Sequence, residues 1–317
     1  MAYLVTGGTG FIGSYVVRDL VRAGEKVIAY DLYPSNHALR RLLNDDESRR
    51  IEIIRGDVLD LGFLLHALKD YNVERIVHLA YLLPTVAAPN PPLSVRVNCG
   101  GTVNVFEAAR LLGLKKVFWA SSISVFGMTD KYPQGEIPND APHYPKVIYG
   151  ASKSFNEIVA RFYSDHYNLD TVALRYGIVY GLGMERSRAS DIVQELIEHP
   201  ALGKPGRVPY GDSIINWLYV DDAAAATVLA AKSGRTSNRV FNISGHVRSV
   251  AEVAGVVRQL IPEADVALLP GDMANPYQFD TGAIERELGF RPQWPVERAV
   301  KDMLNTVRSE HGLSPLT

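Results

Sequence analysis

The chain has 317 residues, of which 47% are hydrophobic and 21% charged, so a disordered or fibrous protein is excluded. Its 33 basic and 35 acidic side chains leave a net charge of −2, which gives no global field for binding nucleic acid or anionic lipid. The single cysteine, Cys99, cannot form an internal disulfide, and the first residues lack the pattern of a secretion signal. The stretch 76–95 lacks Asp, Glu, Lys and Arg, but its prolines would break a membrane-spanning helix. We therefore expect a cytoplasmic protein with a small-molecule substrate, without nucleic-acid or membrane partners and without a metal site.

Short runs rich in valine, isoleucine and leucine alternate with stretches of helical periodicity along the chain. Such alternation is typical of a parallel sheet whose crossover helices cover both faces. The sequence thus predicts an α/β fold, a doubly wound parallel sheet of the Rossmann type. The predicted strands are 4–6, 26–31, 51–55, 75–79, 116–120, 171–176 and 239–244, and the predicted helices include 11–23, 61–70, 103–112 and 220–232.

A smaller, discontinuous α/β lobe is expected beside this sheet. The stretch 181–211 is irregular, and the tail from residue 247 opens with Ser249 three residues before Glu252, the spacing of a helix capping box. Residues 281–288 and 296–307 are expected to be helical. We predict a cofactor-binding Rossmann domain made of 1–174 plus 210–245, and a substrate-binding lobe made of 175–209 plus 246–317.

The first predicted strand runs into the sequence Thr-Gly-Gly-Thr-Gly-Phe-Ile-Gly at residues 6–13. A glycine permits the tight turn, a second lets the backbone approach a pyrophosphate, and a third brings helix against sheet, while free amides at the helix start bind the anion. The spacing is GxxGxxG. It predicts a dinucleotide site at Gly7, Gly10, Phe11, Ile12 and Gly13.

Asp31 ends the second predicted strand, where an acidic side chain hydrogen-bonds the adenosine ribose hydroxyls and repels a 2′-phosphate. We therefore predict NAD rather than NADP as the cofactor. Arg40 and Arg41 follow some residues later and offer the alternative, a phosphate contact.

A phenol and an ammonium, Tyr149 and Lys153, are four residues apart and so share one face of a helix. A nearby cation and a bound, positively charged nicotinamide favour the phenolate, which makes tyrosine a competent general base. Ser121 and Ser122 end the fifth strand, so a hydroxyl there would face the same pocket. We predict Tyr149, Lys153 and Ser122 as the catalytic residues and assign Ser121 to turn hydrogen bonds.

Together these motifs resemble the extended short-chain dehydrogenase/reductase superfamily, on its NAD-dependent epimerase/dehydratase side. The resemblance runs from residue 3 to about 307. It also rests on Gly-Asp-Val at 56–58, His-Leu-Ala at 78–80, Asn98 with the Gly-Thr-Val-Asn-Val of 101–105, Val-Phe-Gly at 125–127 and Tyr-Gly-Ala-Ser-Lys at 149–153.

The resemblance implies roles for further residues. Asp57 and Val58 would flank the adenine, Leu79 and Ala80 would line the cofactor path, and Asn98 would lie near the nicotinamide half. Lys153 would also hold the nicotinamide ribose hydroxyls, while Ser122 and Tyr149 would touch the substrate. Family members commonly form homodimers through the helices that here would be 102–112 and 150–167.

The sequence departs from the family at the positions that set the reaction. Dehydratases follow the hydroxyl residue with an Asp-Glu pair, and here Ile123 and Ser124 follow it. Nucleotide-sugar epimerases hold the diphosphate with an Asn and two Args, and this chain has Ile178, Ile215 and Leu269 there. Arg186 and Arg188 are the alternative substrate-binding cations.

We therefore expect an NAD-dependent dehydrogenase that acts on a secondary alcohol of a sugar, sugar acid or hydroxy acid. The alternative is a nucleotide-sugar 4-epimerase in which the same residues oxidise C4 transiently. A third hypothesis is a non-catalytic NAD-sensing regulator. The presence of Tyr149, Lys153 and Ser122 together argues against it.

Overall fold

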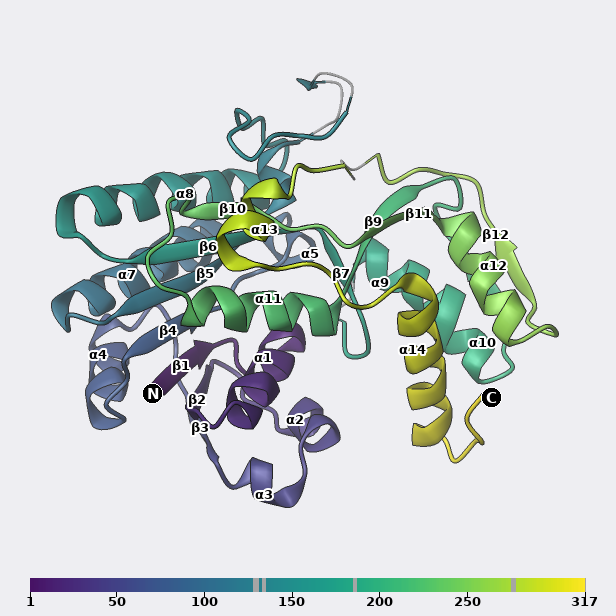
Figure 1. Cartoon of the computed structure of the whole chain (residues 1–317), viewed down its shortest axis with the longest axis horizontal. Helices are drawn as coiled ribbons and strands as arrows, with labels where there is room; N and C mark the ends of the chain where they lie inside the picture. The colour runs from purple at the N-terminus through teal and green to yellow at the C-terminus, as the bar shows by residue number, and fades with distance from the viewer. Residues whose placement is uncertain (128–130, 133–134, 185–186, 275–277, 317) are drawn as a thin grey trace.

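A parallel sheet of seven strands forms the larger part of the molecule (Figure 1). The computed structural model describes residues 1–316 apart from 128–130, 133–134, 185–186 and 275–277. The strand order is β10-β6-β5-β4-β1-β2-β3, so the chain reverses direction across the sheet between β1 and β4. Ligands of open α/β sheets bind at the carboxyl ends of the strands beside such a reversal. The strands are β1 (Ala2–Thr6), β2 (Lys26–Asp31), β3 (Ile51–Arg55), β4 (Arg75–His78), β5 (Lys116–Ser122), β6 (Thr171–Tyr176) and β10 (Val240–Asn242).

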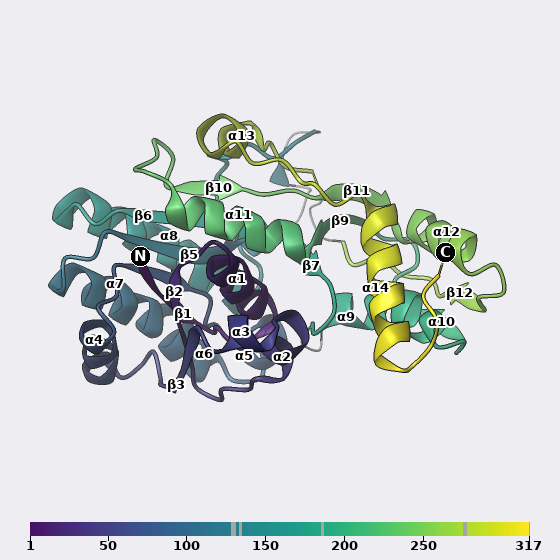
Figure 2. The same cartoon turned by 60° about the horizontal axis from the view of Figure 1, so that its bottom comes forward.

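Helices cover both faces of this sheet, which confirms the predicted doubly wound fold (Figure 2). In β1 the side chains of Tyr3 and Val5 enter one apolar core and Leu4 the other, as the alternation of a strand requires. One face carries α1 (Phe11–Arg22) and α11 (Val220–Lys232), and the other carries α4 (Leu61–Asp70), α7 (Thr102–Leu111) and α8 (Ile148–Tyr167). Short helices in the connections are α2 (His37–Leu42), α3 (Asp45–Ser48), α5 (Pro84–Ala87), α6 (Pro91–Ser94), the π-helix η1 (Val95–Gly101) and the 3₁₀-helix η2 (Ile123–Val125).

The smaller lobe is built around two small sheets, and most of its helices stand together at one end of the molecule, whereas the helix Gly282–Leu288 lies beside β10 (Figure 2). Ser249 caps the helix Val250–Leu260 reciprocally with Glu252, as the sequence predicts. One sheet contains β7 (Ile178–Tyr180), β9 (Ile214–Tyr219) and β11 (His246–Ser249), and the other contains β8 (Gly206–Val208) and β12 (Val266–Leu268). The remaining elements are α9 (Arg188–Val193), the π-helix η4 (Gln194–Glu198), α10 (His199–Ala201), α12 (Val250–Leu260), α13 (Gly282–Leu288) and α14 (Val296–Glu310).

The strand β9 lies outside the seven-stranded sheet. It pairs in parallel with β7 and antiparallel with β11. The sequence predicts one domain of 1–174 plus 210–245 and another of 175–209 plus 246–317. This division places β9 in the first domain, and it stays a prediction.

A third apolar cluster lies where the segment after η2 folds back onto the sheet. The side chain of Asn139 holds this segment against the edge strand β10, because its Nδ2 donates to the carbonyl of Val240 and its Oδ1 accepts from the amide of Asn242. The cluster consists of Ile123, Val125, Phe126, Ile137, Ala141 and Phe279.

The proline-containing stretch 76–95 folds into the end of β4, α5 and α6. Among the residues that the structure describes, no helix is long and apolar enough to cross a membrane.

Candidate active site

The turn between β1 and α1 leaves little room for a side chain at Gly7 and none at Gly13. Gly7 has a φ of +68°, and a Cβ there would lie 3.0 Å from the backbone of Leu79 and Ala80. A Cβ on Gly13 would lie 2.0 Å from the carbonyl oxygen of Gly7. The loop therefore packs directly on the segment after β4, as the roles predicted for these glycines require.

The first turn of α1 offers backbone donors at this loop. Gly10 precedes the helix without a side-chain cap, and the first backbone amide that bonds back to it is that of Ser14, at 3.0 Å. Within the described part of the chain, the amides of Phe11, Ile12 and Gly13 have no partner outside the helix. Three free donors at a helix N-terminus fit the diphosphate of a dinucleotide.

Asp31 is fixed at the end of β2 by the glycine-rich loop. Its Oδ2 accepts from the hydroxyl of Thr9 at 2.7 Å and from the amide of Thr9 at 3.2 Å, which leaves Oδ1 to the amide of Tyr33 at 3.3 Å. Arg41, the alternative residue for a phosphate contact, has another partner, because its Nη2 donates to the carbonyl of Leu182 at 2.8 Å. The side chain of Asp31 thus lies at the end of β2, and its predicted contact with the adenosine ribose stays a prediction.

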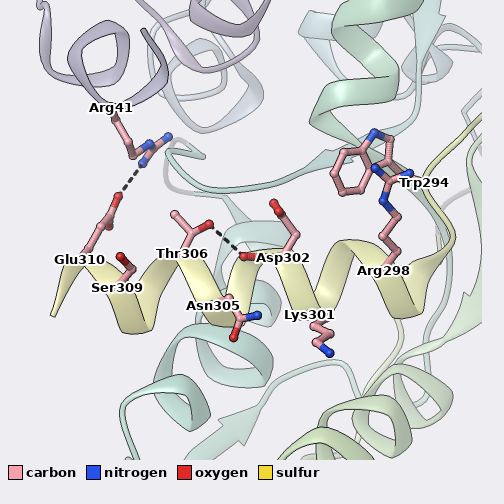
Figure 3. A pocket seen from close by; sticks show the side chains of 9 residues that line it. All are labelled: Arg41, Trp294, Arg298, Lys301, Asp302, Asn305, Thr306, Ser309 and Glu310. Carbon is pink, nitrogen blue, oxygen red and sulfur yellow. Dashed lines mark hydrogen bonds and ion pairs between the residues drawn. The ribbon is translucent and has the colours of Figure 1, made fainter. Parts of the chain in front are cut away.

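Arg41 borders a separate cleft of about 620 Å³ between α2 and α14 (Figure 3). Across it Arg41 Nη1 lies 3.8 Å from Glu310. None of the predicted cofactor or catalytic residues lines this cleft, so it is distinct from the candidate active site. Its lining consists of Arg41, Trp294, Arg298, Lys301, Asp302, Asn305, Thr306, Ser309 and Glu310.

The segment that packs on Gly7 is held by the hydroxyl of Thr6. Thr6 Oγ1 accepts from the amides of Leu79 and Ala80 at 3.2 and 3.3 Å, so its one proton is left for Nδ1 of His78 at 2.7 Å. The other ring nitrogen, Nε2, then donates to Thr102 Oγ1 at 3.1 Å. Burial lowers the pKa of His78 to about 3, so the ring is neutral.

Asp57, Val58 and Asn98 are fixed by backbone contacts. Asp57 Oδ1 accepts from the amide of Leu59, and Val58 packs so closely that a Cβ on Gly101 would lie 2.6 Å from it. Asn98 bonds the backbone of Leu82 in both directions and so shapes the segment after β4. The contacts to adenine and nicotinamide that the resemblance implies for these residues stay predictions.

The three predicted catalytic residues meet at the carboxyl end of β5. Tyr149 and Lys153 are buried one turn apart on α8, and Lys153 Nζ lies 5.3 Å from the centre of the Tyr149 ring. Lys153 Nζ donates to the carbonyl of Ala120 at 2.6 Å. Ser122 caps η2 by accepting from the amide of Ser124 at 3.1 Å. A Cβ on Gly150 would lie 2.2 Å from the carbonyl oxygen of Ser124, so this glycine lets α8 approach η2.

Burial disfavours the charged forms of both members of the pair. It raises the pKa of Tyr149, an effect that a hydrogen bond with Ser122 opposes. It also lowers the pKa of Lys153 well below its usual value, and the neighbouring Cys99 and Glu157 only partly offset this. A positive charge bound beside Tyr149 would therefore have a large effect on its ionisation.

The turn hydrogen bonds predicted for Ser121 are not what the structure shows, because Ser121 belongs instead to a buried network that the sequence does not reveal. Its hydroxyl donates to Glu157 Oε1 at 2.6 Å. Both oxygens of Glu157 also accept from the buried Arg175 of β6. The available signal was that Glu157 lies four residues after Lys153 and hence on the same helix face.

Tyr81 is a second residue that the sequence reasoning missed. It follows the His-Leu-Ala of 78–80, and its ring centre lies 2.7 Å from Lys153 Nζ and 4.6 Å from the centre of the His78 ring. The available signal was an aromatic side chain directly after residues expected to line the cofactor path.

The expected substrate side is apolar at the three positions singled out from the sequence. Ile178 packs partly buried against the core and Ile215 is buried in it, whereas Leu269 is 44% exposed after β12. Arg188 is exposed, with its guanidinium 5.8 Å from the ring centre of Tyr210. The other predicted cation, Arg186, lies outside the described residues.

A Rossmann sheet with a glycine-rich first turn and a Tyr–Lys helix at its carboxyl edge is typical of dinucleotide-dependent oxidoreductases. Residues 3–244 match the model of the NAD dependent epimerase/dehydratase family, and the chain belongs to this family. Membership confirms the predicted family and an NAD-dependent enzyme of the extended short-chain dehydrogenase type, and it stands against the non-catalytic regulator.

Similar proteins include epimerases and dehydrogenases. The chain is 30% identical to UDP-glucose 4-epimerase of Mycolicibacterium smegmatis, covering 98% of this chain and 99% of that one. A Thermus thermophilus UDP-glucose 4-epimerase, solved in complex with NAD, is 26% identical with a TM-score of 0.81 over 97% and 99% of the two chains. L-threonine dehydrogenase from Phytophthora infestans is 25% identical with a TM-score of 0.84 over 99% and 100%.

Proposed function

We propose that this protein is a dehydrogenase that oxidises a secondary alcohol of a small polar substrate, with NAD as the hydride acceptor. The observation that carries the proposal is the buried set of Tyr149, Lys153 and Ser122 at the carboxyl end of β5. Its place at the strand ends, close to the glycine-rich turn of β1, puts proton transfer and cofactor binding in one region of the sheet.

The residues present fit NAD. The diphosphate would bind at the tightly packed turn of Gly7 and Gly13. The backbone amides at the start of α1, which have no partner in the helix, would donate to it. Asp31, fixed by Thr9, would accept from the adenosine ribose hydroxyls. The family resemblance adds Asp57, Val58, Leu79, Ala80 and Asn98 along the cofactor path and Lys153 at the nicotinamide ribose.

The chain's own residues would move the proton. When bound, NAD⁺ supplies the acceptor for the hydride that leaves the alcohol carbon, and its positive charge favours the Tyr149 phenolate. Tyr149 then takes the hydroxyl proton, so the alcohol becomes a carbonyl as its C–H and O–H bonds break. Ser122 would donate to the reacting oxygen and support the charge that develops on it.

A small substrate is favoured by the absence of a diphosphate anchor at three positions. Ile178, Ile215 and Leu269 cannot bond anionic oxygens. The likeness to an L-threonine dehydrogenase adds support, because L-threonine carries a secondary alcohol and no nucleotide. Arg186 and Arg188 are our candidates for the carboxylate of such a substrate.

The second candidate is a nucleotide-sugar 4-epimerase. The 30% identity to a UDP-glucose 4-epimerase over nearly the whole of both chains favours it. Its reaction would use the same three residues, but it also requires a nucleotide anchor.

One experiment separates the two candidates. We would incubate the protein and NAD⁺ with L-threonine, other hydroxy acids, sugars and sugar acids, and measure NADH by absorbance and the product by mass spectrometry. Uridine, thymidine and guanosine diphosphates would be titrated in parallel. We expect NADH and carbonyl product in equal amounts from one small substrate, and diphosphates binding no tighter than about 1 mM, or about −4 kcal/mol. Micromolar diphosphate binding, or epimerisation without net NADH, would reject the dehydrogenase and make Arg186 and Arg188 the first residues to mutate.

We also propose that the protein is a cytoplasmic homodimer in which α8 contributes to the interface. The helix exposes Phe155, Ile158 and Phe162 by 44%, 69% and 47%, at the spacing of one helix face. α7, the other helix that the resemblance implies, packs beside it (Figure 1). Ile158→Glu should give a monomer by light scattering, whereas Ile214→Glu, at a 43% exposed position of β9, should leave the mass unchanged. A monomeric wild-type protein would reject the proposal.

A further inference from the structure

Hydrogen bonds to side chains hold the backbone in place on both sides of Tyr81. Before it, the amides of Leu79 and Ala80 donate to Thr6, and after it the amide and carbonyl of Leu82 both bond the side chain of Asn98. The backbone on either side is therefore fixed by two different side chains. The direction of the Cα–Cβ bond of Tyr81 is thereby set, and its ring lies inward against Lys153.

The ring of Tyr81 covers the ammonium group of Lys153. Nζ lies 2.7 Å from the ring centre and is completely buried, with a hydrogen bond to the carbonyl of Ala120 at 2.6 Å. The negative face of an aromatic ring attracts a cation, and more strongly where water is excluded. The ring is thus placed to favour the ammonium form, against the cost of burial.

The phenol group itself forms no such interaction. Its oxygen is buried and meets no described partner at full hydrogen-bond geometry, although the side chain of Thr102 lies close enough to oppose the rise in the Tyr81 pKa that burial causes. Because no hydrogen bond joins this oxygen to Lys153 among the described residues, the face of the ring accounts for the contact.

Other titratable groups face this pair, and they offer Lys153 little compensation. Glu157 is bound in an ion pair with Arg175, and His78 is neutral. The facing groups are Tyr149 and Glu157 from α8, His78 from β4, Cys99 from η1 and Tyr176 from β6.

We propose that Tyr81 is a positioning residue for the Tyr149–Lys153 pair: the face of its ring holds the Lys153 ammonium in place and favours the charged form. The charge, 5.3 Å from the Tyr149 ring, then favours the phenolate. Tyr81 acts through Lys153. The inference rests on the proposed function for its catalytic consequence, but the effect on Lys153 is measurable without substrate or cofactor.

The experiment follows the ionisation of Lys153 in the protein without ligand. Lysine labelled with carbon-13 at Cε gives a resonance that reports its protonation, and Lys153→Met identifies the signal by its loss. The variants are Tyr81→Leu and Tyr81→Met, which remove the ring but keep an apolar side chain, and Tyr81→Phe, which removes only the hydroxyl. Thermal unfolding checks that each is folded.

We expect the Lys153 titration midpoint to move down by about one pH unit in Tyr81→Leu and Tyr81→Met and to stay in place in Tyr81→Phe. With a substrate from the panel, the acid limb of the kcat profile should move to higher pH in the Leu and Met variants and be restored in the Phe variant. An unchanged midpoint in Tyr81→Leu or Tyr81→Met, or a shift in Tyr81→Phe as large as theirs, would overturn the proposal. A wild-type protein that forms no NADH would instead reject the proposed function and leave the titration to decide the role of Tyr81.

Discussion

Glu157 of α8 and Arg175 of β6 form a buried ion pair through two parallel hydrogen bonds: Nε donates to Oε1 at 2.8 Å and Nη2 to Oε2 at 2.7 Å. Each side chain is less than 10% exposed. Arg175 lies opposite Ser121 in the register of β5 and β6, and Ser121 donates to the same carboxylate. The Glu157 carboxylate therefore joins the helix that carries Tyr149 both to β6 and to β5, the strand that ends in Ser122.

Glu157→Gln should be strongly destabilising, because it leaves the Arg175 guanidinium buried without a counter-charge. We expect the free energy of unfolding to fall by about 3–5 kcal/mol, measured by urea denaturation.

The matched control is Asp265→Asn, which breaks the ion pair of Asp265 with Arg207. Both of those side chains are at least 50% exposed, so solvent screens them and the denaturation midpoint should hardly move. Equal effects of the two substitutions would show that the buried pair adds nothing to stability.

Asp31 should exclude NADP. A 2′-phosphate would meet the carboxylate in a partly desolvated site, so we expect NAD to bind at least about tenfold more tightly, measured by calorimetry. Asp31→Asn keeps an acceptor for Thr9 but removes the charge, and should bring the two affinities together. Arg40→Gln, at an exposed position, should change neither. Equal affinities in the wild-type protein would contradict the role of Asp31.

Tyr149→Phe removes the proton acceptor and leaves the ring in the core. Turnover should fall by about 10² to 10⁴ while the affinity for NAD changes little, as measured by steady-state kinetics and calorimetry. Tyr167→Phe, at a 48% exposed position on the same helix, serves as the control and should keep full turnover. If Tyr149→Phe keeps a third of the wild-type turnover, Tyr149 is not the general base.

His78 should make the fold sensitive to acid. In the folded state its pKa is lowered to about 3 from an ordinary value of 6.5, so between these pH values the unfolded chain binds a proton that the folded one does not. The free energy of unfolding should therefore fall as the pH falls through this window, by up to about 1.4 kcal/mol for each pH unit.

His78→Gln removes this titration. Its denaturation midpoint should be lower than that of the wild type at pH 7, because the bonds to Thr6 and Thr102 are disturbed, but the difference should narrow toward pH 4. A difference that stays constant with pH would mean that His78 does not titrate on unfolding.

The sequence predicted the elements whose patterns are local. The helix 220–232 matches α11 at both ends, and the glycine spacing placed the turn after β1. The predicted strand 239–244 is shorter in the structure, where β10 lies at the sheet edge with one neighbouring strand. No strand was predicted at 214–219, because β9 depends on β7 and β11, which come from distant parts of the chain.

The candidate catalytic set could be picked out because the spacing of Tyr149 and Lys153 on one helix is itself local. The buried polar partners of this set could not be predicted from the sequence. Periodicity indicates which apolar side chains turn inward, but it does not indicate that Glu157 and Arg175 enter the core as a pair. The inward direction of Tyr81 depends on bonds to Thr6 and Asn98, which lie on other elements.

The carboxamide of Asn139 has a consequence for how this protein behaves at high concentration. It donates to the carbonyl of Val240 and accepts from the amide of Asn242, and so takes the two bonds that a neighbouring strand would make with β10. Unpaired strand edges recruit strands from other molecules and start aggregation. A single loop side chain thus blocks the β10 edge of the large sheet against a strand from a second copy.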